Sequence, residues 1–235
     1  ALILVQASLG GLRVLMNDVN LAIPHAFAGQ LYFCLLLGLG LAHTRTWQNN
    51  DWTMKDFQHL QPLRRTAVVL LVLIFIQLMI AATMRHHGAG LAIRYFPWSG
   101  PDYAWLPVAW NYEVAIHFFH RILAAVITIA YAVLALRAYR NSRQSKGLKH
   151  SVSLIGLILF AQIALGASII WTGREAIPTS LHVVVGAFFL GISFLLTFYL
   201  YKPKLVCLET SKRTSDPELT VSVPANDSTI PPLRP

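Results

Sequence analysis

The stretch at residues 113–136, EVAIHFFHRILAAVITIAYAVLAL, decides the fold, because it is apolar enough to lie in a bilayer. Its first two turns nevertheless carry His117, His120 and Arg121. A charged side chain at the centre of a membrane costs about 2.5–3.5 kcal/mol on insertion scales, so ionisable residues in a span indicate a functional site. His117 and His120 are three residues apart and share one face of a helix. We expect this face to hold a ligand.

The composition is typical of a membrane protein. Of the 235 residues, 55% are hydrophobic and 12% are charged, and the mean hydropathy is +0.54. The formal net charge is +9, but the basic residues lie between apolar segments rather than in one stripe. This distribution argues against nucleic acid as a partner. Basic residues between apolar segments instead indicate how a membrane protein is oriented in the bilayer. Cys34 lies inside an apolar segment and Cys207 lies beyond the last one, so we expect no disulfide between them.

Six apolar segments have roughly the length of a membrane span, and no alternating strand pattern competes with them. They lie at residues 1–16, 21–42, 67–84, 114–136, 152–171 and 179–201. The predicted fold class is therefore all-α, a polytopic membrane protein. The loops 43–66 and 137–150 and the start of the tail are basic, which makes their side cytoplasmic by the positive-inside rule. The loop 85–113 falls on the outer side, where its aromatic, glycine and proline content predicts a folded cap.

The chain contains an internal repeat. The segment QASLG that begins at Gln6 recurs as QIALG at Gln162. His25 follows 19 residues after Gln6, and His182 follows 20 residues after Gln162. Residues 1–42 and 152–201 therefore look like two copies of one helix pair, and such repeats often build the sites of membrane proteins.

The repeat predicts a domain organisation of two pseudo-symmetric four-helix bundles, the first one incomplete. Residues 67–201 form the complete C-terminal unit, and residues 1–42 form the third and fourth helices of the N-terminal unit. The chain is expected to be a fragment that lacks the first two helices of that unit. Residues 43–66 are predicted to be a cytoplasmic linker. Residues 202–235, which lose apolar periodicity and gather Ser, Thr and Pro, are predicted to be a disordered cytoplasmic tail.

Three histidines lie about one turn inside the outer ends of their spans, and so share roughly one depth: His25, His120 and His182. Imidazole is a common ligand of haem iron, and facing helices of a bundle can supply two axial ligands. His120 and His182 are the natural axial pair, and His25 takes the place of His182 in the other unit. The alternatives are interhelical hydrogen bonds and zinc. The chain has no cysteine cluster, and carboxylates are sparse near these histidines.

Further candidates line the outer side. His117 lies one turn further out than His120, where it could contact a porphyrin edge or propionate. Arginines near the outer helix ends either snorkel to the interface or bind carboxylates, of which a porphyrin has two. These arginines are Arg13, Arg85, Arg94 and Arg121.

Several spaced motifs together resemble the haem A synthase family of cytochrome oxidase assembly proteins. They are LVQASLGGLRV, MRHHGAGLA followed by Phe96-Pro97, HFFHR, and FAQIALGAS followed by His182. The resemblance covers nearly all of residues 1–201 and implies eight transmembrane helices in two halves. It implies that the C-terminal half binds a haem b cofactor, and its iron, through His120 and His182. It also implies that His25 is the ligand of the substrate haem, at the catalytic site.

The resemblance implies an activity as well, the oxidation of the ring D methyl of haem O to a formyl group, giving haem A. The expected location is the bacterial plasma membrane, or the mitochondrial inner membrane in a eukaryote. The partners implied are haem O, haem O synthase, terminal oxidase assembly factors and a second copy of the chain. The fragment alone is expected to be inactive, because the family's glutamate–x–x–histidine–arginine motif is absent. His117 stands where that motif has its glutamate.

Other features depart from the family pattern or leave alternatives open. The outer loop has none of the cysteine pairs that many members carry, and His87 and Tyr95 replace a threonine and an acidic residue. A non-catalytic membrane electron carrier of the cytochrome b type would need His120 and His182 but not His25. A transporter with a buried polar site is a third reading.

Overall fold

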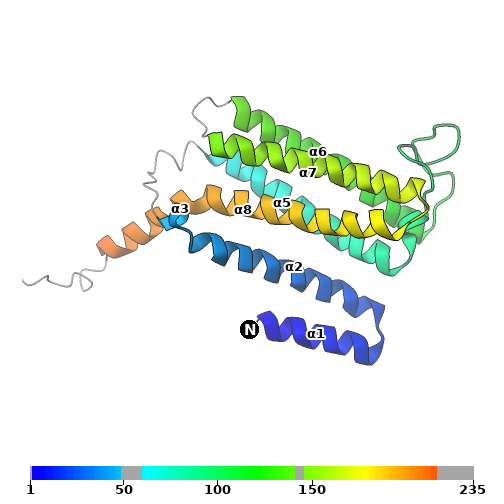
Figure 1. Ribbon diagram of the computed structural model, residues 1–235, viewed down its shortest axis with the longest axis horizontal. Coiled ribbons are helices and arrows are strands. Elements are labelled where there is room, and N and C mark those ends of the chain that lie inside the picture. Colours follow the sequence, from blue (N-terminus) through cyan, green and yellow to red (C-terminus); the bar gives the residue numbers. More distant parts are fainter. Residues whose placement is uncertain (1, 49–59, 141–145, 216–235) are drawn as a thin grey trace, which may run out of the picture.

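The computed structural model describes residues 2–48, 60–140 and 146–215, with side chains described as far as Lys202, and the described chain is all-helical. The helices are α1 (Leu2–Met16), α2 (Val19–Ala42), α3 (Arg45–Gln48), α5 (Gln61–His86), the short 3-10 helix η1 (Ala89–Leu91), α6 (Tyr112–Arg140), α7 (Lys146–Trp171) and α8 (Ala176–Ser215). In Figure 1, α5, α6, α7 and α8 run side by side as an elongated bundle. α2 packs along α5 and α8, and α1 packs on α2.

Five of these helices, α2, α5, α6, α7 and α8, are long and apolar enough to cross a membrane. The protein is therefore a polytopic membrane protein, as the sequence predicts. The first predicted segment forms α1, which is 15 residues long and shorter than the roughly 20 residues that a perpendicular span needs. All six predicted apolar segments are helical.

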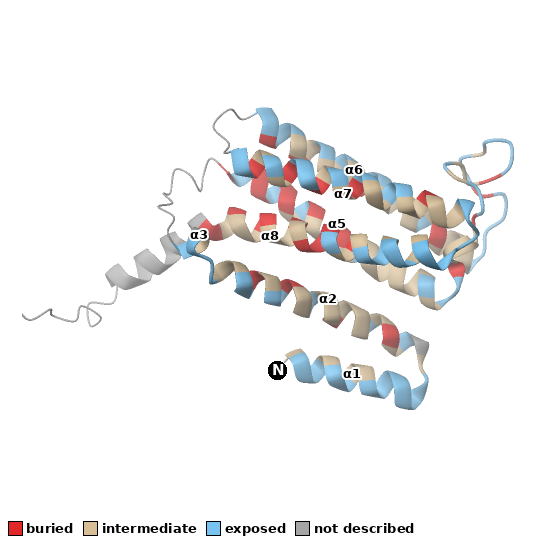
Figure 2. Cartoon of the chain, in the orientation of Figure 1, coloured by how far each residue is buried: buried red, intermediate tan, exposed pale blue. Residues whose placement is uncertain are grey.

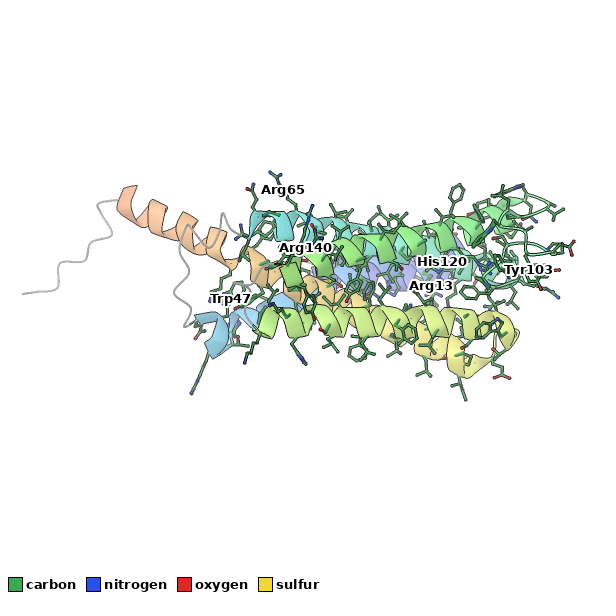
Figure 3. All side chains as sticks on the ribbon, turned by 90° about the horizontal axis from the view of Figure 1, so that it is seen from above. Arg13, Trp47, Arg65, Tyr103, His120 and Arg140 are labelled. Carbon is green, nitrogen blue, oxygen red and sulfur yellow. The ribbon has the colours of Figure 1, made fainter. Side chains whose placement is uncertain are left out.

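The helices extend beyond the apolar segments at the end of the bundle that carries Arg65 and Arg140, which we name the basic end (Figure 3). α5 begins at Gln61, so the predicted linker 43–66 is too long at its C-terminal side. Pro62 lies in the first turn of α5, where its missing N–H costs nothing. A hydropathy pattern marks only the apolar part of a helix, so it misses the charged turns by which α5 extends beyond that part. Of the linker, α3 is helical, and residues 49–59 lie outside the described residues.

The predicted disordered tail begins too early. α8 continues as a helix from Lys202 to Ser215, whereas the sequence analysis starts the tail at residue 202. This segment contains leucine, glutamate, lysine and arginine, all of which favour helix, so the helix continues after the apolar run has ended. Residues 216–235 lie outside the described residues.

The buried apolar core lies between α5, α6, α7 and α8. Figure 2 shows buried residues on the facing sides of these helices, whereas α1 has none. The largest fully buried apolar side chains are Leu70, Leu134, Val152, Ile155, Leu190 and Leu200. This core fixes the helix rotations that direct the polar side chains described below.

Polar contacts fasten the helices together near the basic end. Arg64 Nε donates a 2.5 Å hydrogen bond to the carbonyl oxygen of Leu200, which joins α5 to α8. Arg137 on α6 donates to the carbonyl oxygen of Pro62 over 2.9 Å and to the hydroxyl of Thr66. Each carbonyl oxygen has a second lone pair, so it can accept the arginine N–H in addition to the hydrogen bond within its own helix. The histidines thus lie on a bundle whose far end is fixed.

The interface between α6 and α7 depends on one glycine. Tyr131 on α6 donates a 3.1 Å hydrogen bond to the carbonyl oxygen of Val152 on α7. A Cβ atom at Gly156 would lie 2.0 Å from Tyr131 Oη and 2.6 Å from its Cζ. Only glycine leaves room for the tyrosine ring at this crossing.

Candidate functional site

The three candidate histidines have similar positions in their helices. His25 is the seventh residue of α2, His182 is the seventh residue of α8, and His120 is the ninth residue of α6. At 1.5 Å per residue, each lies about 9–12 Å along its helix from the N-terminus. Figure 3 shows His120 toward the end of the bundle that carries Tyr103, opposite the basic end. The three histidines thus lie at similar distances from the first residues of their helices, and their shared depth stays a prediction.

His182 is held by one glutamine through two contacts. Its Nδ1 lies 3.1 Å from the backbone carbonyl oxygen of Gln162 on α7, and its Nε2 lies 3.2 Å from the Gln162 side-chain nitrogen Nε2. A carbonyl oxygen can only accept, so Nδ1 carries the hydrogen, and in a neutral ring Nε2 keeps its lone pair. A histidine that ligates a metal through Nε2 needs this tautomer.

His120 has a corresponding partner on α5. The Gln77 side-chain nitrogen lies 3.3 Å from His120 Nε2 and donates a 3.0 Å hydrogen bond to the His120 backbone carbonyl. Nδ1 of His120 is buried and has no hydrogen-bond partner among the described residues. His120 and His182 each therefore face a glutamine side chain from a neighbouring helix, and their role as an axial pair stays a prediction.

The α1–α2 pair repeats the packing of α7 and α8 around its own histidine. A Cβ at Gly10 would lie 3.0 Å from Cε1 of His25, and a Cβ at Gly166 would lie 3.3 Å from Cε1 of His182. The glutamines pack in the same way. Gln6 Nε2 would lie 3.0 Å from a Cβ at Gly29, and Gln162 Nε2 would lie 3.1 Å from a Cβ at Gly186. In both pairs, glycines let a histidine and a glutamine approach the opposite helix.

His25 differs from His182 in its hydrogen bonds. Its Nδ1 is buried and has no partner among the described residues, whereas Nδ1 of His182 is held by a carbonyl. The Gln6 Oε1 atom is also buried without a partner there. The tautomer of His25 is therefore not fixed by these contacts.

His117 and Arg121 contact the outer loop rather than the paired histidines. His117 is 4% exposed, and its Nδ1 accepts a 3.2 Å hydrogen bond from the backbone N–H of Ile93. Arg121 donates to the carbonyl oxygens of Trp98, over 2.8 Å, and of Ile93, over 3.2 Å. Its guanidinium also lies 5.7 Å from the centre of the Phe96 ring. The expected folded cap is thus fastened to α6.

The other predicted anchor, Arg85, lies on the last turn of α5 with its side chain exposed. No group of three or more His, Cys, Asp or Glu side chains converges within the described ranges. The polar groups that the structure gathers around the iron-binding candidates are glutamine amides and backbone carbonyls.

A haem iron fits the donor set of His120 and His182. Both are imidazoles with Nε2 placed as an acceptor, they come from different helices, and the polar groups that contact them are uncharged amides and carbonyls. Haem iron with two histidine ligands needs this arrangement. The ligands of a haem b would be His120 and His182, and His25 would be the ligand in the second helix pair.

Sequence reasoning did not pair particular glutamines with particular histidines. The signal was present for two of them, since glutamine and glycine recur four residues apart in QASLG and QIALG and so share a helix face. For Gln77 no such repeat exists, and its contact with His120 follows only from the packing of α5 on α6.

Comparison with known proteins gives consistent results. A family model described as COX15-CtaA, cytochrome oxidase assembly protein, matches residues 1–194. A heme A synthase of Halalkalibacterium halodurans is 28% identical over 104 residues, which cover 44% of this chain and 34% of that protein. A heme A synthase of Caulobacter vibrioides is 30% identical over 132 residues, covering 52% of this chain and 37% of that protein. The matched part of the chain spans about a third of the length of each of these relatives.

Proposed function

Because the chain belongs to the COX15-CtaA family of cytochrome oxidase assembly proteins, we propose that it forms most of a haem A synthase-like oxidoreductase. Its location is the bacterial plasma membrane, or the mitochondrial inner membrane in a eukaryote. Its helices α5 to α8 form one four-helix half, and α1 and α2 belong to the other. The similarity to two heme A synthases supports the reaction, the conversion of haem O to haem A.

One observation carries the proposal: two half-buried histidines from different helices each present Nε2 as an acceptor. His120 and His182 would hold a haem b in this half. A haem held by two histidines has no open position on its iron and supplies electron transfer. Glycine at position 166 lets the His182 ring lie against α7, and the bond from its Nδ1 to the Gln162 carbonyl keeps the ring in one orientation.

His25 is the ligand of the substrate haem in the other half. Its ring is packed against Gly10 as His182 is packed against Gly166. Oxidation of a methyl group to a formyl group removes four electrons from the carbon and adds one oxygen atom. The reaction therefore needs an electron acceptor and an oxygen donor, and a second haem nearby is suited to carry electrons away.

The outer loop covers the end of the bundle opposite the basic end, next to the proposed haem b ligands. Its backbone is bound by His117 and Arg121, which lie on the same helix as His120. We propose that this cap limits the access of water to the haem edge. Arg85 at the end of α5 and Arg94 in the outer loop both have exposed side chains, and either could bind a propionate from outside.

The test is haem binding by the purified chain and by histidine variants. The chain is expressed in a haem-replete host and purified, and its bound haem is extracted and its absorbance spectrum is recorded. The expected spectrum is that of a low-spin haem with two histidine ligands, lost in His120→Ala and in His182→Ala. His150→Ala is the matched control, since His150 is an exposed histidine on the first turns of α7. A double His120→Ala, His182→Ala variant that kept the low-spin spectrum would refute the proposal.

A second measurement separates the synthase from a simple electron carrier of the cytochrome b type. His25→Ala should leave the low-spin haem b spectrum intact. In the complete protein the same substitution should abolish haem A production, with haem O accumulating in the membranes. Unchanged haem A production in that variant would favour the electron carrier.

A further inference from the structure

The haem ligands proposed above are each paired with a glutamine from a neighbouring helix. Gln77 on α5 faces His120 on α6, and Gln162 on α7 faces His182 on α8. In both pairs the side-chain nitrogen of the glutamine lies 3.2–3.3 Å from Nε2, the atom that would bind iron. Because iron and an amide N–H cannot share one lone pair, these contacts belong to the state without haem.

The hydrogen positions at His120 follow from its neighbours. The amide group of Gln77 that faces the His120 carbonyl must be the NH₂ group, because a carbonyl oxygen only accepts. The same nitrogen faces His120 Nε2, so it donates there too, and Nε2 is an unprotonated acceptor. This reasoning does not depend on how the amide oxygen and nitrogen were distinguished.

The hydrogen positions at His182 follow from a different contact and lead to the same tautomer. Its Nδ1 donates to the backbone carbonyl of Gln162, which leaves Nε2 as the acceptor for the Gln162 amide. Two independent contacts, one to a side chain and one to the backbone, thus select the same neutral form. Both histidines are held with the lone pair that a metal requires.

The glutamines are also incompletely bonded in this state. The Oε1 atoms of Gln77 and Gln162 are buried and have no hydrogen-bond partner among the described residues. A buried carbonyl oxygen without a donor is unfavourable. The NH₂ group of each amide is hydrogen-bonded, whereas its oxygen has no such bond within the described part of the chain. Gly186 provides the space for Gln162, since a Cβ there would lie 3.1 Å from its Nε2. Each amide is held mainly by the histidine that it covers.

We propose that Gln77 and Gln162 cover the iron-binding atoms of His120 and His182 in the haem-free protein and compete with iron for them. Each donates a hydrogen bond to Nε2 of its histidine in the haem-free protein, keeps that atom unprotonated, and is displaced from it when iron binds. This inference rests on the proposed function, because it takes His120 and His182 as the iron ligands. The reading that competes with it is that the glutamines only hold the helices together.

Two substitutions at each glutamine distinguish these readings. Gln162→Met and Gln77→Met keep the length of the side chain and remove the donor, so iron no longer competes with an amide for Nε2. Gln162→Glu and Gln77→Glu replace the donor with a group that only accepts, which draws a proton to Nε2 and removes the lone pair. A role in packing alone predicts that both kinds of variant bind haem less well. The proposal predicts opposite effects.

The experiment uses the full chain, purified without haem from a haem-deficient host and placed in lipid nanodiscs. Iron protoporphyrin IX is added, and the low-spin Soret band is followed over time and to equilibrium. We expect the methionine variants to bind about 2- to 12-fold more tightly, the change that one net hydrogen bond produces. The glutamate variants should bind at least about tenfold more weakly. Gln30→Met, which removes a glutamine whose Oε1 is also buried in a span, should leave binding unchanged.

A second readout needs no haem. Spectra of the haem-free chain with ¹⁵N-labelled histidine should show His120 and His182 as neutral rings protonated at Nδ1. Their Nε2 resonances should move in the methionine variants and stay in place in Gln30→Met. Rings protonated at Nε2, or methionine variants that bind haem no more tightly than the wild type, would overturn the inference. Failure of the wild type to form a low-spin haem would instead refute the proposed function, whereas the spectra would still decide whether the glutamines hold both rings in the form protonated at Nδ1.

Discussion

Replacing Gly156 with alanine should weaken the interface between α6 and α7. The new Cβ would lie 2.0 Å from Tyr131 Oη and 2.6 Å from Cζ, so the ring has to move and its bond to the Val152 carbonyl is lost. Overpacking of this kind costs about 1–3 kcal/mol and a net hydrogen bond about 0.5–1.5 kcal/mol, against about 1 kcal/mol gained from alanine's helix propensity. The expected net loss is therefore about 0.5–3.5 kcal/mol of unfolding free energy.

The measurement is thermal unfolding in detergent, compared with Gly11→Ala. No atom lies within 4 Å of a Cβ at Gly11, so that helical substitution should be neutral or stabilising. In a Tyr131→Ala background the cost of Gly156→Ala should largely disappear, because the two residues are in direct contact. Equal unfolding temperatures for Gly156→Ala and Gly11→Ala, with tyrosine present, would refute the packing described for this crossing.

Three further changes test the outer end of the bundle. Gly166→Ala puts a Cβ 3.3 Å from Cε1 of His182, so the imidazole ring must shift by a few tenths of an ångström. The low-spin haem spectrum of this variant should therefore be weaker than that of Gly11→Ala. Arg121→Gln removes two hydrogen bonds to loop carbonyls, so limited proteolysis of the loop should be about tenfold faster or more. An unchanged cleavage rate would contradict the role of Arg121 in holding the loop to α6. His117→Phe leaves the Ile93 N–H without its acceptor and should lower the unfolding free energy by about 1–3 kcal/mol. Chemical denaturation measures this loss. Unchanged stability would show that the hydrogen bond between His117 and Ile93 contributes nothing.

The membrane-spanning architecture could be predicted because each span is a local property of the sequence. About 20 apolar residues in a row must be helical in a bilayer, whatever surrounds them. The ends of the spans could not be predicted in this way. α5 starts at Gln61 and α6 ends at Arg140, because basic turns continue the helices, whereas hydropathy counts those residues as loop.

The candidate site was predictable only as far as the repeat reaches. The register of His25 and His182 follows from two similar segments, and the structure shows the same glycine contacts for both. The partner of Arg121 could not be inferred, because its donors meet loop carbonyls whose position depends on the fold of the loop. For the same reason, an arginine considered for binding a propionate lies instead against Ile93 and Trp98.

A single turn of α6 contains His120, which faces Gln77, and also His117 and Arg121, which hold the outer loop. The contacts that hold the outer loop and the contact of His120 with Gln77 therefore lie within about 6 Å along one helix. Sequence changes in the loop that shift this part of α6 should accordingly alter the His120–Gln77 contact, several residues away.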